Sequence, residues 1–168
     1  MPTTDPASVV LRQLAATLAY RAAKVLRDVP ADFARQSFGS STRQPVQVVA
    51  HLADLMAWGV SMAGGGKEWK ADGGDDWATE VDRFFRGLAA LDAALAAEGS
   101  FAGSIDKLIP GPLADALTHV GQLAMLRGMA GAPVRPESYA RATIVAGRVG
   151  LDQPPPGFEF DGDASARR

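Results

Sequence analysis

Apolar residues recur every three or four positions along most of this 168-residue chain. This period matches the 3.6 residues of an α-helical turn rather than the two-residue alternation of a strand, so each periodic stretch predicts a helix with one buried face. Four long stretches and no convincing strand predict an all-α fold, a four-helix bundle with a short C-terminal helix. The long helices are expected at residues 6–29, 45–63, 75–98 and 112–130, and the short one after Pro136, through Tyr139, Ile144 and Val149.

Capping and breaking residues set the expected helix ends. Asp5 before Pro6 provides an N-cap acceptor and then a residue whose missing N–H costs nothing at the first helical position. Pro45 starts the second helix, and the three glycines that follow Ala63 stop it. The connections at about 31–44 and 98–111 are too long for tight helical hairpins, so at least one crossover connection is expected.

Length and charge limit the organisation of the chain and its partners. Residues 1–150 are expected to form one bundle domain, and residues 151–168, with three consecutive prolines, an irregular and mobile tail. The 17 Lys and Arg against 19 Asp and Glu give a net charge of −2, which argues against a nucleic-acid partner because phosphate contacts require a concentrated positive field. No apolar run reaches the roughly 18 residues of a membrane span, and no secretory signal is recognisable, so a cytoplasmic protein without a membrane partner is expected.

The chain contains no Cys, which limits the chemistry that its side chains can carry out. Disulfides, thiolate metal sites and a cysteine nucleophile are therefore excluded. Both histidines, His51 and His119, lie within apolar stripes of the expected second and fourth helices, and Asp115 precedes His119 by four residues. That spacing puts both side chains on one helix face, where an inward-facing His51 from another helix could complete a triad for one divalent ion. Two nitrogens and one oxygen suit zinc, nickel or ferrous iron, with open positions for water or substrate.

The same residues also have ordinary structural interpretations. A lone buried histidine is more often a hydrogen-bonded core residue than a ligand, and the Asp115–His119 pair could simply stabilise its helix by roughly 0.2–0.5 kcal/mol. Gln122 could orient a ligand or bond a metal-coordinated water, or be a surface amide. Arg127 could hold a substrate carboxylate or be solvated. Asp54 is assigned to solvent or to supporting a ligand, and the core or a cleft wall is expected to contain Trp58, Trp69, Trp77, Phe84 and Phe85.

Two motifs resemble those of a known family. The segment His51–Trp58, HLADLMAW, resembles the second-helix motif of the DinB-like superfamily, which includes YfiT-type proteins and mycothiol-dependent maleylpyruvate isomerases. The segment Asp115–Val134 is similar to the fourth-helix motif, and residues 80–95 resemble the third helix. The similarity covers most of residues 7–150 in order and spacing. In the fourth helix it rests on a histidine, a glutamine, a Leu-Arg pair and a Gly-x-Pro turn, here His119, Gln122, Leu126-Arg127 and Gly131-Ala132-Pro133.

The resemblance implies a four-helix bundle with one crossover, usually in a homodimer. It also implies a divalent ion held by one histidine of the second helix and two ligands of the fourth, which on this chain are His51, Asp115 and His119. The middle ligand is usually a histidine in the family. Asp115 at that place adds a negative charge, which favours a harder ion and makes it a weaker Lewis acid.

The function that the resemblance implies is metal-dependent chemistry on a small-molecule substrate. Enzymes of the family use the metal to activate a low-molecular-weight thiol, which attacks an electrophile or isomerises an unsaturated acid. In this hypothesis Arg127, or a residue of the loop 63–75, holds the acidic substrate or the thiol, and a hydrolase using metal-activated water is a variant. Two alternatives are a non-catalytic, stress-related dimer whose ion only joins two helices, and a small-molecule-binding bundle without a metal. An ion with three ligands and access to water would favour an enzyme over either.

Overall fold

Helices make up the regular structure of residues 5–97 and 102–160, which are the residues that the computed structural model describes. Four of them are long and pack around one apolar core to which all four contribute. The all-α prediction is therefore confirmed for this part of the chain. In order the elements are α1 (Pro6–Leu26), η1 (Phe33–Arg35), α2 (Pro45–Ala63), α3 (Trp77–Ala96), α4 (Ile105–Leu108), η2 (Ile109–Leu113) and α5 (Ala114–Met129).

The N-terminus of α1 follows the sequence prediction, whereas its C-terminus comes earlier than expected. The Asp5 carboxylate caps the helix by accepting a 3.0 Å hydrogen bond from the backbone N–H of Ala7. The helix ends at Leu26 instead of running to Val29. Val29 directly precedes Pro30, and a residue before proline is disfavoured in the helical region, so the chain leaves the helix before it.

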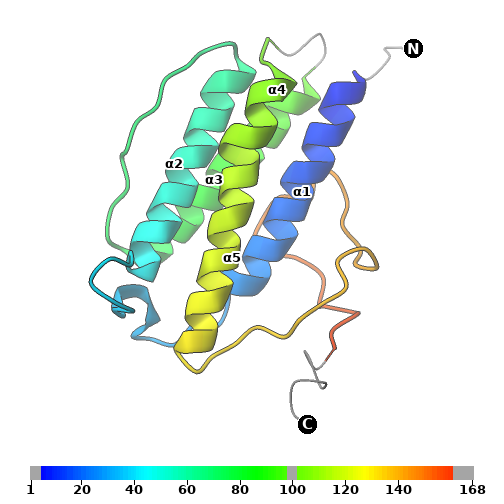
Figure 1. Cartoon of the computed structure of the whole chain (residues 1–168). Helices are drawn as coiled ribbons and strands as arrows, with labels where there is room; N and C mark the ends of the chain where they lie inside the picture. The colour runs from blue at the N-terminus through cyan, green and yellow to red at the C-terminus, as the bar shows by residue number, and fades with distance from the viewer. Residues whose placement is uncertain (1–4, 98–101, 161–168) are drawn as a thin grey trace.

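The directions of the helices matter most for the site. In Figure 1, α2 and α3 run in one direction and α1 and α5 in the other. Each of α2 and α1 packs against both α3 and α5. Because α2 and α3 are parallel, residues 64–76 must travel back along the outside of α2 to reach the start of α3 (Figure 1). We call residues 64–76 the return segment. The sequence analysis expected a crossover from the longer connections at about 31–44 and 98–111 and did not single out this one.

The return segment lies close against α2. A Cβ atom added at Gly73 would meet the Ala50 Cβ at 2.7 Å, a separation that real side chains do not adopt. The backbone N–H of Asp72 donates a 3.3 Å hydrogen bond to the carboxylate of Asp54 on α2. These contacts hold the segment beside the helix that carries His51.

The start of the fourth long helix is less regular than expected. A helix starting at Pro112 was predicted, but α5 begins at Ala114, after the short helix α4 and the wide turn η2. The backbone is non-helical at Gly111, with φ −75° and ψ −110°. Pro110 and Pro112 flank this kink, and neither can donate to the i→i−4 hydrogen bonds of a continuous α-helix. The expected end of the third helix at Glu98 lies outside the described residues.

The predicted short helix after Pro136 is wrong, because residues 132–160 contain no helix. The backbone N–H groups of Ser138 and Phe160 instead donate to the carbonyls of Phe158 and Pro136, at 3.1 and 3.0 Å. A helix of about a dozen residues is marginal without strong packing, and here the side chains find other partners. The Tyr139 ring meets the Tyr20 ring edge-on, with 6.3 Å between ring centroids. Of the predicted tail, residues 161–168 lie outside the described residues, and residues 151–160 contain neither helix nor regular strand.

The most apolar helix is α2, and by length and composition alone it is a weak candidate for a membrane span. It has 19 residues, with a mean hydropathy of 1.3 over its most apolar window. The sequence analysis expected no such stretch. However, 67% of that window is buried inside the protein, as is usual for the central helix of a packed core.

Candidate metal centre

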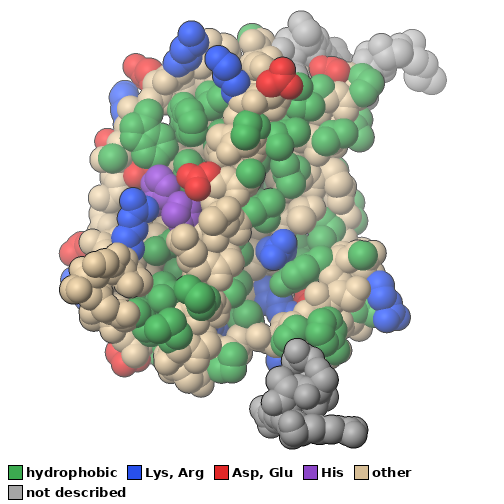
Figure 2. All heavy atoms as spheres, viewed as in Figure 1, with side chains coloured by type: hydrophobic (Ala, Val, Ile, Leu, Met, Phe, Trp, Pro, Cys, Tyr) green, Lys and Arg blue, Asp and Glu red, His purple; other side chains and the backbone are tan. Residues whose placement is uncertain are grey.

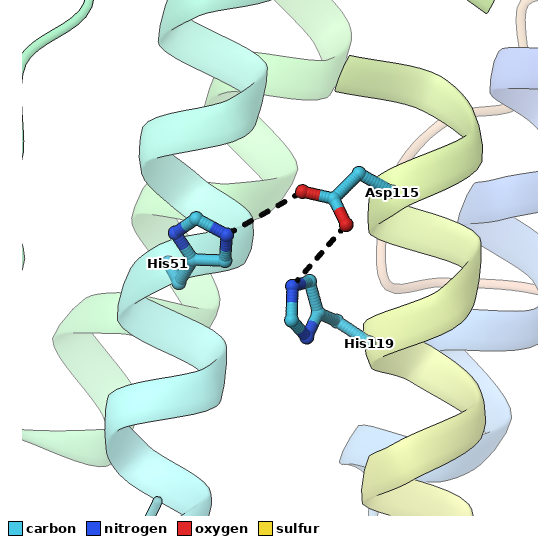
Figure 3. A group of neighbouring side chains, drawn as sticks. All are labelled: His51, Asp115 and His119. Carbon is cyan, nitrogen blue, oxygen red and sulfur yellow. Dashed lines mark ion pairs between the residues drawn. The ribbon is translucent and has the colours of Figure 1, made fainter. Parts of the chain in front are cut away.

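Three side chains meet between α2 and α5 (Figure 3). His51 comes from α2, and Asp115 and His119 come from successive turns of α5. One oxygen of Asp115 lies 3.6 Å from His51 Nε2, and the other lies 3.4 Å from His119 Nε2. One possible ligand atom from each residue lies within 4.8 Å of those of the other two. The structure thus brings together the three residues that the sequence proposed as metal ligands, and the group could hold a metal ion.

The separations within this group suit a shared ion better than direct hydrogen bonds. A good N–H···O bond joins atoms about 2.7–3.2 Å apart, and both His–Asp contacts are longer than that. A tetrahedral zinc ion with bonds of about 2.0–2.1 Å separates its ligand atoms by about 3.4 Å. The two His–Asp separations are therefore close to that between neighbouring ligand atoms of a divalent ion, and all three possible ligand atoms lie within 4.8 Å of one another.

The group is also open to solvent on one side. The side chains of His51 and His119 are 21% and 12% exposed, and that of Asp115 is 44% exposed. Figure 2 shows the two histidines at the surface beside a carboxylate, on the face formed by α2 and α5. An ion held here would have positions left for water or for a small molecule.

Gln122 fixes the ring of His119. Its amide Oε1 lies 2.7 Å from His119 Nδ1, a contact that suits the tautomer with its proton on Nδ1, because an amide oxygen only accepts hydrogen bonds. The lone pair of Nε2 then points to the carboxylate of Asp115. Two electron-rich atoms that face each other require a proton or a cation between them, and a hydrogen bond to the outer ring nitrogen is the usual arrangement for a metal-bound histidine.

Electrostatics favour the neutral, ligand-competent form of His51. Burial lowers the pKa of His51, and the neighbouring His119 and Arg43 lower it further, while Asp115 acts in the opposite sense. A histidine must lose its proton to bind a metal. The lowered pKa therefore keeps the His51 lone pair available near neutral pH.

Two residues near the group have positions that the sequence analysis did not predict. Trp69 of the return segment meets His51 edge-on, with 5.6 Å between ring centroids, and meets Trp58 in the same way at 5.7 Å. The second residue is Arg43, which lies in the connection before α2 and lines two hollows together with His51. Neither residue lies on a helix, so the helical spacing of apolar residues could not predict that they approach His51. Of the other aromatic residues, Phe84 and Phe85 are buried in the core and Trp77 packs on Phe33.

Arg127 does not join the group, although the sequence analysis offered it as a substrate anchor. Its guanidinium is buried and donates to the backbone carbonyls of Val25, Arg27, Asp28 and Ala132, at 2.7–3.3 Å. These carbonyls belong to the end of α1 and to the turn after α5. These contacts give Arg127 a structural role. They do not support the expectation that it holds an acidic substrate.

Asp54 is buried, whereas the sequence analysis placed it in solvent or beside a ligand. Its carboxylate accepts a 2.7 Å hydrogen bond from Arg83 Nη1. The same guanidinium pairs with Glu80 at 2.7 Å and donates to the carbonyl of Ala50 at 2.9 Å. Asp54 therefore joins α2 to α3, on a face of α2 adjacent to that of His51.

Comparisons with known proteins leave the family open. The chain matches no family model, no curated protein and no solved structure. The function therefore has to be inferred from the site itself.

Proposed function

We propose that this protein is a divalent-metal-dependent enzyme that acts on a small electrophile, with His51, Asp115 and His119 as the metal ligands. The observation that carries the proposal is the open three-ligand group, in which both histidines present Nε2 to one carboxylate at 3.4–3.6 Å. A divalent ion at this place would make a small thiol or a water molecule ionise near neutral pH. Because the chain has no Cys, a thiol would have to come from a cosubstrate.

The number of ligands favours an enzyme over a purely structural ion. Within the part of the chain that the structure describes, the group contains three His, Cys, Asp or Glu residues. Structural zinc sites are closed by four protein ligands, whereas catalytic sites keep an open position. The exposure of Asp115 and His51 leaves room for that position.

We further propose that the chain belongs to the DinB-like superfamily that its motifs resemble. The parallel α2 and α3 support this, because the return segment that joins them then corresponds to the single crossover connection of that bundle. The placement of one ligand on α2 and two on α5 supports it as well. The homodimer, the low-molecular-weight thiol and the cytoplasmic location remain predictions.

The proposal is tested by titrating the chelator-treated protein with Zn²⁺ and Ni²⁺ in a calorimeter. We expect one site per chain, and a melting temperature that rises with metal, since an ion at 100 times its dissociation constant stabilises the folded state by about 2.7 kcal/mol. His51→Ala and His119→Ala should each lose more than about 100-fold in affinity, because loss of an outer-sphere partner alone costs about 10–100-fold. Gln122→Met should fall within that smaller range.

Thr118→Ala is the matched control, because Thr118 is exposed on α5 next to His119 and its hydroxyl donates to the carbonyl of Ala114 on the same helix. It should bind zinc as the unmodified chain does. Equal zinc affinity in His119→Ala and in Thr118→Ala would remove the three residues as ligands. It would leave a small-molecule-binding bundle without a metal as the better hypothesis.

A further inference from the structure

A cationic side chain stands beside the candidate metal centre. Arg43 and the two residues before it border an open hollow of about 390 Å³ that both histidines of the centre also line. Arg43 and His51 also border a second hollow of about 520 Å³, on the side of the return segment. The first hollow is lined by Ser41, Thr42, Arg43, Val48, His51, His119, Gln122, Met125 and Leu126.

Arg43 has no carboxylate partner among the described residues. Among residues 5–97 and 102–160, no hydrogen bond or ion pair involves its side chain, and the side chain is exposed. By contrast, Arg12 and Arg83 each meet a carboxylate at 2.9 Å or less.

The other walls of the hollow define what kind of molecule fits. Val48, Met125 and Leu126 provide an apolar surface, and Ser41 and Thr42, which precede Arg43 in the chain, also line the hollow. Of the described Lys and Arg residues, Arg43 alone lines this hollow. The planar, singly charged guanidinium can pair with both oxygens of a carboxylate through two parallel hydrogen bonds.

We infer that Arg43 binds the carboxylate of a small, partly apolar substrate, and that this hollow is the substrate site of the candidate metal centre. The apolar body of the molecule lies against Val48 and Leu126, and its reactive end faces His51 and His119. The inference names the substrate class of the proposed enzyme. It rests on the proposed function only in that the reactive end of the substrate is placed at the metal. Binding of the carboxylate at Arg43 needs no metal.

The probes for the test are phenylacetate and its neutral analogue phenylacetamide, titrated into the full chain by NMR with and without Zn²⁺. We expect phenylacetate to bind more tightly than phenylacetamide in both states. Arg43→Met should lose roughly ten- to hundredfold in phenylacetate affinity, the usual size of a charge-assisted hydrogen-bonded pair, and should bind phenylacetamide unchanged. Arg43→Lys should recover part of the loss, because an ammonium supplies the charge without the fork.

Arg86→Met is the control, because Arg86 is an exposed arginine of α3 that pairs with Asp82 outside the hollow. Equal phenylacetate affinity in Arg43→Met and the unmodified chain, or an equal loss in Arg86→Met, would overturn the inference. So would the absence of any phenylacetate binding.

The zinc titration separates this inference from the proposed function. If zinc does not bind but phenylacetate binding still depends on Arg43, the metal proposal fails and the carboxylate site stands. If zinc binds through His51 and His119 while Arg43→Met binds phenylacetate as tightly as the unmodified chain, the carboxylate site fails and the metal proposal stands.

Discussion

Asp115 contributes the one negative charge of the candidate metal centre. With two neutral histidines, a divalent ion there would leave a net charge of about +1 at the site. Its carboxylate is 44% exposed and spans the two histidines, one oxygen to each. A third histidine in its place would give a site of higher charge and softer ligands.

At this residue we predict an order of metal affinities. Asp115→Asn keeps the shape but removes the charge, and should weaken zinc binding by at least about tenfold, because the carboxylate is the only negatively charged ligand in the group. Asp115→His restores a nitrogen donor and should retain zinc while gaining in preference for nickel over harder ions. Calorimetric titration with Zn²⁺, Ni²⁺ and Mn²⁺ measures the order. If Asp115→Asn binds zinc as tightly as the unmodified chain, the carboxylate is not a ligand.

The pair of helices α2 and α3 determines how the return segment and His51 are placed. The two helices approach so closely at Gly87 that a Cβ atom there would lie 2.8 Å from the Cβ of Met56. That contact involves an atom fixed to the backbone of α2, so a flexible side chain cannot relieve it. The same close packing continues at Gly59, where a Cβ would lie 3.2 Å from the side chain of Leu91.

Two glycine substitutions in helices should therefore have opposite effects on stability. Gly87→Ala should destabilise the protein by about 1–3 kcal/mol, because the methyl group overpacks the interface by more than its helix propensity offsets. Gly121→Ala on α5 should stabilise it by about 0.5–1 kcal/mol, because nothing lies within 4 Å of the added methyl group. Urea unfolding of both variants gives the two free energies. Stabilisation by both substitutions would mean that α2 and α3 are farther apart than described.

At the scale of the molecule, two buried clusters join distant parts of the chain. Arg127 ties the end of α5 to the end of α1 through backbone carbonyls. Glu137, beyond α5, accepts hydrogen bonds from Tyr20 at 2.7 Å and Lys24 at 2.8 Å on α1. Both clusters are held by long-range contacts, which hold residues 132–160 against α1 without helical structure of their own.

We predict that Arg127 supports stability and not metal binding. Arg127→Leu should lower the free energy of unfolding by about 2–4 kcal/mol, because several carbonyls lose a charged donor. Zinc affinity should stay unchanged. Arg86→Leu, at an exposed ion pair, should change stability by less than about 1 kcal/mol. Urea unfolding and zinc titration of both variants provide the comparison, and a selective loss of zinc or carboxylate binding in Arg127→Leu would return this residue to the site.

Features set by neighbouring residues could be predicted from the sequence. The four long helices follow from apolar periodicity, and the cap at Asp5 follows from its place before Pro6, because helix formation and capping depend on residues within about one turn. The proximity of Asp115 and His119 follows from their i,i+4 spacing on one helix. For the same reason the sequence could propose Gln122, three residues further on, as a partner of His119.

The remaining features depended on how the helices pack, and the tertiary structure alone decided them. The position of His51 opposite α5, the covering of His51 by Trp69 and the approach of Arg43 all join residues that are distant in sequence. Which helices become neighbours, and at what height along their axes, depends on the fit of many side chains at once, and periodicity describes only the face that each helix buries. The structural role of Arg127 and the missing fifth helix have the same cause, because in both cases contacts with α1 outweigh the local pattern.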